Sequence, residues 1–68
     1  EMPHEALSDR EFQVLCMLAS GKTATDIADE LALSVKTVST HRAHILEKTN
    51  MKNNAELTHY AFFKGLVH

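Results

Sequence analysis

The sequence predicts an all-α domain of four short helices. Four residues of the kinds that favour helix N-caps each precede a run with apolar residues at helical spacing: Ser8, Thr23, Ser34 and Asn53. No alternation of apolar and polar residues is long enough to predict a strand. The 68 residues, 44% of them hydrophobic, suit one small domain with one core, and they leave little room for a deep catalytic cleft.

The first helix is predicted to run from Asp9 to about Ala19. Ser8 and Glu11 have the spacing of a capping box at its start, and Gly21 stands just past its end, where a left-handed cap is common. The apolar stripe of this helix, which we expect in the core, comprises Val14, Leu15, Leu18 and Ala19.

Residues 1–6 contain a proline and show no periodicity, so we expect a mobile linker or its remnant there, followed by one domain over residues 7–68. The chain begins without an initiator Met, which indicates a fragment of a longer protein. No signal peptide or apolar run of membrane-spanning length appears, and the single Cys16 cannot form an internal disulfide. We therefore expect a cytoplasmic protein without a membrane partner.

The second helix is predicted over residues 24–31, where Thr23 and Asp26 repeat the capping arrangement. Its apolar side comprises Ile27, Ala28 and Leu31. Only residues 32–34 separate it from the next helix. Two helices joined so tightly must cross steeply, which predicts a helix-turn-helix.

The third helix is predicted over residues 35–48, after the Ser34 cap. One side forms a core stripe of Val38, Ile45 and Leu46, closed by Thr49, whose buried hydroxyl we expect to lack a partner. The opposite side is mostly small and polar, and it comprises Lys36, Ser39, Thr40, Ala43 and Glu47. A helix with these two sides is suited to a DNA major groove.

The fourth helix is predicted over residues 54–64, with Asn53 as N-cap, Glu56 as capping-box partner and Gly65 at its end. One side should pack on the first helix, with the last residues behind it: Leu57, Tyr60, Ala61, the stem of Lys64, Leu66 and Val67. The outward side carries an apolar patch that predicts a homodimer interface: His59, Phe62 and Phe63.

The charges are unevenly distributed along the chain. Residues 1–30 hold seven acids and two bases, whereas residues 31–68 hold two acids and five bases. The net charge of −2 argues against a chain coated for nucleic acid. However, exposed charges act over about one Debye length, roughly 8 Å, so the local excess of bases around the third helix favours an anionic partner there.

Several spaced motifs carry a family resemblance: L-S-D-R-E (7–11), L-A-S-G-K-T (18–23), D-I-A-D-E-L (26–31), L-S-V-K-T-V-S-T-H (33–41), I-L-E-K (45–48) and A-E-L (55–57). Together they span residues 7–67 and resemble the LuxR-type helix-turn-helix domain of bacterial transcription regulators. The segment H-R-A-H-I-L-E-K is most similar to C-terminal effector domains of NarL/FixJ-group response regulators in two-component systems.

The resemblance implies a four-helix domain that binds promoter DNA as a dimer and follows an N-terminal phosphoacceptor receiver domain. RNA polymerase is a further candidate partner. Three positions depart from the family pattern. Thr49 stands where the family usually has an apolar residue. Asn54 stands where an arginine that could brace the fourth helix is common, and Ser39 stands where lysine is frequent.

Two groups of DNA contacts are predicted. Base edges would be read by Lys36, Ser39, Thr40 and Ala43, and phosphates would be contacted by the flanking Thr37, His41, Arg42, His44 and Lys48 and, at the start of the second helix, by Thr23 and Thr25. Structural alternatives stay open: Thr23 as a cap, His41 as half-buried, the Arg42 stem as a cover for Leu46, and Lys48 as a solvated end.

An enzyme is the poorer alternative. His41 and His44 have no third residue at metal-ligand spacing, and no sequence neighbour suggests a base for Cys16, so we expect no catalytic residue, metal or cofactor. A helical protein-interaction module without DNA binding is the second alternative, and the net charge of −2 favours it.

Overall fold

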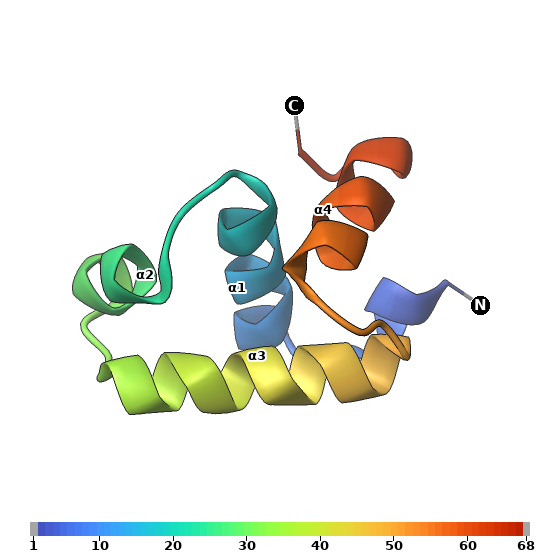
Figure 1. The fold of residues 1–68 in the computed structure, drawn as a ribbon. Coiled ribbons are helices and arrows are strands. Elements are labelled where there is room, and N and C mark those ends of the chain that lie inside the picture. The colour runs from blue at the N-terminus through green and yellow to red at the C-terminus, as the bar shows by residue number, and fades with distance from the viewer. Residues whose placement is uncertain (1, 68) are drawn as a thin grey trace.

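The computed structural model describes residues 2–67 as a set of helices, without a strand in that range. The elements are the 3₁₀-helix η1 (Pro3–Ala6) and the α-helices α1 (Asp9–Ala19), α2 (Ala24–Leu31), α3 (Val35–Thr49) and α4 (Asn54–Phe63) (Figure 1). The all-α prediction is confirmed. The expected bounds hold except that α3 ends one residue later and α4 one residue earlier than predicted.

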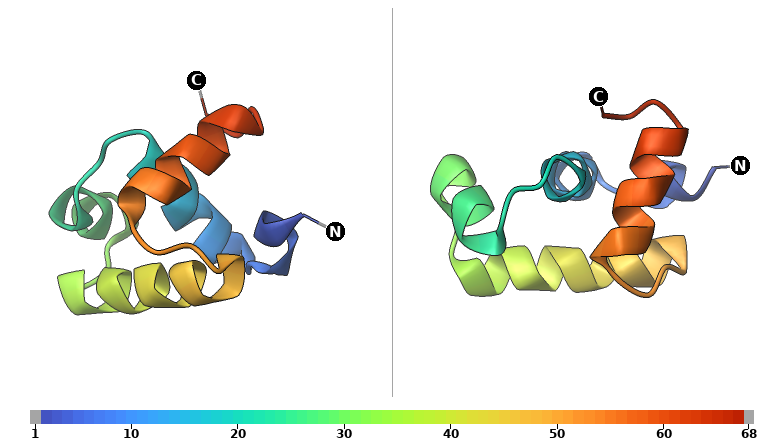
Figure 2. Two further views of the ribbon diagram at one scale, coloured as in Figure 1. Left: turned by 45° about the vertical axis from the view of Figure 1, so that its right-hand side comes forward. Right: turned by 45° about the horizontal axis from the view of Figure 1, so that its top comes forward.

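The longest helix, α3, forms one side of the molecule, and α1, α2 and α4 all lie on the other side of it (Figure 1). The two further views in Figure 2 agree that no other helix covers its outer side. Helix α1 packs against α3 and α4, and α2 packs across the N-terminal half of α3. This steep α2–α3 crossing is the expected helix-turn-helix.

The core lies where these helices meet. Its fully buried side chains come from all four α-helices: Val14, Leu15, Ile27, Val38, Ile45 and Leu57. A smaller cluster of Ala19, Ala61 and Val67 joins α1 to the C-terminal residues. The predicted stripe of α1 is therefore confirmed. In the predicted stripe of α3, Val38, Ile45 and Thr49 are buried and Leu46 is half-buried. Burying these aliphatic groups is the main force that holds α3 in place, at about 25 cal/mol per Å² of apolar surface.

The predicted N-caps are all formed. Ser8 Oγ accepts a hydrogen bond from the Glu11 N–H at 3.2 Å, and equivalent bonds cap α2, α3 and α4. The capping box expected at α4 forms only one of its two hydrogen bonds, the one that Asn53 accepts. Glu56 Oε1 accepts from the N–H of Lys52 at 2.9 Å, not from that of Asn53, because the extended cap residue leaves the preceding N–H within reach.

Part of the segment predicted to be a mobile linker has regular structure. Glu1 lies outside the described residues, but Pro3–Ala6 form one 3₁₀ turn that packs against α3. Its His4 Nδ1 lies 2.6 Å from the hydroxyl oxygen of Tyr60 on α4. Proline presets the backbone angle φ at the start of this turn. Tyr60 is therefore tied to η1 as well as to the core side of α4.

Two further expectations about side chains are wrong. The Lys64 stem does not pack on α1, because Lys64 follows the last turn of α4 and is exposed, with its ammonium 5.7 Å from the Phe63 ring centroid. The buried Thr49 hydroxyl does have a partner, since its Oγ1 donates to the carbonyl of Ile45 at 2.7 Å. This bond to the preceding turn is the usual one for a threonine inside a helix.

Candidate nucleic-acid interface

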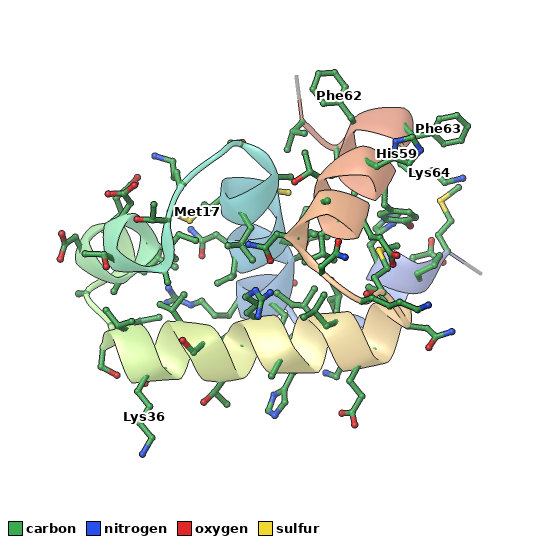
Figure 3. The ribbon with its side chains drawn as sticks, in the orientation of Figure 1. Met17, Lys36, His59, Phe62, Phe63 and Lys64 are labelled. Carbon is green, nitrogen blue, oxygen red and sulfur yellow. The ribbon has the colours of Figure 1, made fainter. Side chains whose placement is uncertain are left out.

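The outer side of α3 carries the four predicted base-reading residues, all of them exposed: Lys36, Ser39, Thr40 and Ala43. Figure 3 shows Lys36 projecting away from the other helices. Thr40 Oγ1 donates to the carbonyl of Lys36 at 3.1 Å. Its hydroxyl proton is therefore engaged, and the side chain offers its methyl group and an acceptor oxygen outward.

The predicted phosphate contacts differ in how far they are exposed. His44 and Lys48 are exposed, whereas Thr37, His41 and Arg42 are half-buried at the edges of the core stripe. The Thr37 hydroxyl lies 2.9 Å from that of Ser34. At the start of α2, Thr23 and Thr25 are both exposed, and Thr23 Oγ1 caps the helix by accepting from the Asp26 N–H. The capping role proposed for Thr23 is thus confirmed, and its contact with phosphate stays a prediction.

Glu11 on α1 is a member of this site that sequence reasoning missed. Its side chain is 7% exposed, and it lies between two side chains of α3, with Oε1 2.8 Å from Lys48 Nζ and Oε2 3.6 Å from His44 Nδ1. The Lys48 hydrogen bond, followed by that from the Ser8 N–H, lowers the pKa of Glu11 to about 2, although burial acts in the opposite direction. The only sequence signal for Glu11 is its place in the capping box, which does not indicate a partner 37 residues away.

A second tie links α3 to the start of α4. Arg42 Nε donates to Asn54 Oδ1 at 2.6 Å. Asn54 stands where the resemblance implies an arginine that could brace α4, and here the brace runs the other way, from an arginine on α3 to a neutral acceptor. The sequence alone does not pair these two positions, because they lie 12 residues apart on different helices.

The outward side of α4 carries the predicted dimer residues. His59 is exposed, and Phe62 and Phe63 are 61% and 77% exposed. The rings of His59 and Phe63 stack, with centroids 6.2 Å apart and planes inclined by 12°. Figure 3 shows Phe62 pointing to another side of the helix from this pair. The patch is therefore divided into a stacked pair and a single ring.

Other kinds of site find little support among residues 2–67. Within that range, no group of three His, Cys, Asp or Glu side chains could hold a metal ion. Cys16 is half-buried, and burial raises the pKa of its thiol, which disfavours the reactive thiolate. No helix in the described part of the chain is long and apolar enough to cross a membrane.

Comparison with known proteins decides between the classes that this geometry allows. Residues 5–61 match the family described as "Bacterial regulatory proteins, luxR family". The chain belongs to this family. LuxR-type domains are DNA-binding domains of transcription regulators and are generally not enzymatic, so the family indicates DNA as the partner of this domain.

The curated relatives of this LuxR-type domain are regulators. The chain is 41% identical over 66 residues to the transcriptional regulatory protein LiaR of Bacillus subtilis, and the match covers 97% of the chain and 31% of LiaR. It is 45% identical over 65 residues to the oxygen regulatory protein NreC of Staphylococcus epidermidis, a match that covers 96% of the chain and 30% of NreC. It is 39% identical over 66 residues to the response regulator UvrY of Escherichia coli, where the match covers 97% of the chain and 30% of UvrY. The chain thus spans less than a third of these relatives, and the resemblance to response regulators is confirmed.

Proposed function

We propose that the domain binds promoter DNA sequence-specifically as a dimer, with residues 35–48 of α3 in the major groove of each half-site. One observation carries the proposal: α3 buries Val38 and Ile45 in the core and leaves its opposite side, from Lys36 to Ala43, exposed and free of any covering helix. A B-DNA major groove is about 12 Å wide and admits one α-helix with short side chains on its leading face.

The exposed side chains set the expected mode of reading. Ser39, Thr40 and Ala43 offer hydroxyl and methyl groups, and none of these makes the bidentate contact that arginine makes with guanine. Specificity in each half-site is therefore modest, and DNA shape and the pairing of two half-sites supply the rest. Phosphates are contacted from the flanks of the groove by Thr37, His41, Arg42, His44, Lys48, Thr23 and Thr25.

Dimerisation is assigned to α4. His59, Phe62 and Phe63 are exposed on the terminal helix, away from the core side that Leu57 and Ala61 occupy. A two-fold axis at this helix would place the same patch on both subunits, with the two α3 helices about 34 Å apart, which is one turn of DNA.

The longer protein is proposed to be a response regulator of a two-component system in the bacterial cytoplasm, where promoter DNA lies. The support is the similarity to UvrY, a response regulator of which the chain spans 30%. In this proposal an N-terminal receiver domain precedes the DNA-binding domain, and RNA polymerase is a second partner at the promoter.

The decisive experiment is a titration of labelled duplex DNA with the 68-residue chain at several salt concentrations. If each subunit neutralises roughly three to four phosphates, log Kobs of a bound dimer should fall with log salt at a slope of about −5 to −7, from about −0.9 per phosphate. A flat response would contradict DNA binding and would support the alternative, a protein-interaction module.

A further inference from the structure

The Arg42–Asn54 hydrogen bond joins the proposed DNA-reading helix to the proposed dimer helix. The bond is short, 2.6 Å between Nε and Oδ1, and it connects the middle of α3 to the first residue of α4. Because the guanidinium is planar, a partner at Nε fixes the plane in which its two terminal amino groups lie. Among residues 2–67 those amino groups make no hydrogen bond, so they remain available for an oxygen outside the protein.

The surroundings of this bond favour an anion. Arg42 is half-buried, Asn54 is exposed, and the bond between them lies at the molecular surface. No carboxylate within residues 2–67 forms an ion pair with Arg42, in contrast to Lys48, which is paired with Glu11. Arg42 is therefore the cation of α3 whose charge is fixed in position without being neutralised.

We propose that Asn54 is a positioning residue for DNA binding, which holds the Arg42 guanidinium in the orientation that contacts a phosphate. The inference rests on the proposed function. An unrestrained arginine loses side-chain rotamer freedom when it binds, and a side chain already held in place loses less. A neutral acceptor suits this role, since a carboxylate at the same place would hold the guanidinium but also neutralise it.

The test compares four variants of the 68-residue chain, Asn54→Ala, Arg42→Ala, the double variant and Asn54→Asp, by DNA affinity and salt slope, with thermal unfolding measured separately. Asn54→Ala is expected to weaken binding to mixed-sequence duplex DNA by roughly three- to tenfold. The double variant should bind no more weakly than Arg42→Ala alone, since Asn54 acts through Arg42. Asn53→Ala is the matched control, because it removes the α4 cap, lowers the unfolding midpoint and leaves the Arg42 bond in place.

Asn54→Asp separates positioning from structure. An acidic residue in the first turn favours a helix, so the unfolding midpoint should stay the same or rise. DNA affinity should nevertheless fall, and the salt slope should become shallower by up to about 0.9 per subunit as Arg42 is neutralised. The inference would be overturned if Asn54→Asp had the DNA affinity and salt slope of the wild type. It would also be overturned if Asn54→Ala lowered DNA affinity as much in the Arg42→Ala background as in the wild type. Failure of the proposed function looks different, since the wild-type chain itself would then show no salt-dependent binding.

Discussion

The carboxylate of Glu11 on α1 and the ammonium of Lys48 on α3 form an ion pair of 2.8 Å that ties the proposed DNA-reading helix to the core. The same carboxylate accepts the Ser8 N–H at 2.9 Å, so the cap of α1 and the C-terminal half of α3 share one group. Glu11 therefore connects the stability of the domain to the position of Lys48, which flanks the proposed groove face.

This pair predicts a loss of stability in acid. The pKa of Glu11 is about 2 in the folded chain, against 4.5 for a free glutamate side chain. The contribution of this carboxylate to stability is therefore complete above about pH 4.5 and is lost as the pH falls toward 2. We expect a loss of roughly 1–2 kcal/mol, less than the full shift implies, because Lys48 is 41% exposed and solvent screens the pair.

Urea unfolding of the wild type and Glu11→Gln at pH 7 and pH 3 checks this prediction. The variant should be less stable at pH 7 and should lose less stability between the two pH values. Glu47→Gln, at an exposed position on α3, serves as the control. If both variants lose stability with pH as the wild type does, Glu11 does not carry the effect.

The hydrogen bond of Thr49 reverses the effect on stability that the sequence alone predicts for Thr49→Leu. An unpaired buried hydroxyl would make Thr49→Leu stabilising, but the hydroxyl is bonded to Ile45 and the residue is only 6% exposed. Adding volume at a packed position costs about 1–3 kcal/mol, so Thr49→Leu should lower the unfolding midpoint. Thr49→Val keeps the volume and should stay close to the wild type, since Ile45 O retains its bond from the helix backbone. A raised midpoint in Thr49→Leu would show that the site can expand.

Ala32 is a strained residue in the turn of the helix-turn-helix. It ends α2 with φ 57° and ψ 44°, a left-handed conformation that costs a residue with a Cβ about 1–2 kcal/mol. Ala32→Gly removes this cost but gives a more flexible unfolded chain, so we expect a net gain of roughly 0.5–1 kcal/mol in thermal unfolding. Ala32→Val is the contrasting variant and should destabilise the domain. A Gly variant less stable than the wild type would mean that the turn is held by its contacts and not limited by strain.

Local signals explain which features could be predicted from the sequence. The start of α2 follows from the Thr23 cap, and the core positions Val38 and Ile45 of α3 follow from helical spacing. The contacts Glu11–Lys48 and Arg42–Asn54 could not be predicted. Their residues lie 37 and 12 positions apart in the chain, respectively, and they meet only because of the way the helices pack. For the same reason the contact between His4 of η1 and Tyr60 of α4, 56 positions apart in the chain, could not be predicted.

Substitutions on the outer side of α3 should separate base reading from phosphate contact. Thr40 and Ala43 are exposed in the middle of this side, so Thr40→Gln and Ala43→Lys are expected to change the preference among operators by roughly 1–3 kcal/mol at the contacted base pair. Arg42→Ala should weaken all sequences alike. Binding to a library of duplexes measures both effects. Equal losses on every sequence from the Thr40 and Ala43 variants would place these residues outside base reading.

The apolar residues of α4 give the test of dimerisation. Phe62 is 61% exposed, so Phe62→Ala should leave the unfolding midpoint nearly unchanged, while burial of one such ring per subunit is worth roughly 1.5–3 kcal/mol. We therefore expect Phe62→Ala to abolish cooperative binding to an operator with two half-sites and to spare single-site affinity.

Phe63→Ala reports on the other side of α4, because the Phe63 ring stacks on His59 and points away from Phe62. Met2→Ala, at another exposed apolar position, is the control. Loss of cooperativity in Phe63→Ala alone would move the two-fold axis to the His59–Phe63 pair, and unchanged cooperativity in both variants would show that the dimer forms through another surface.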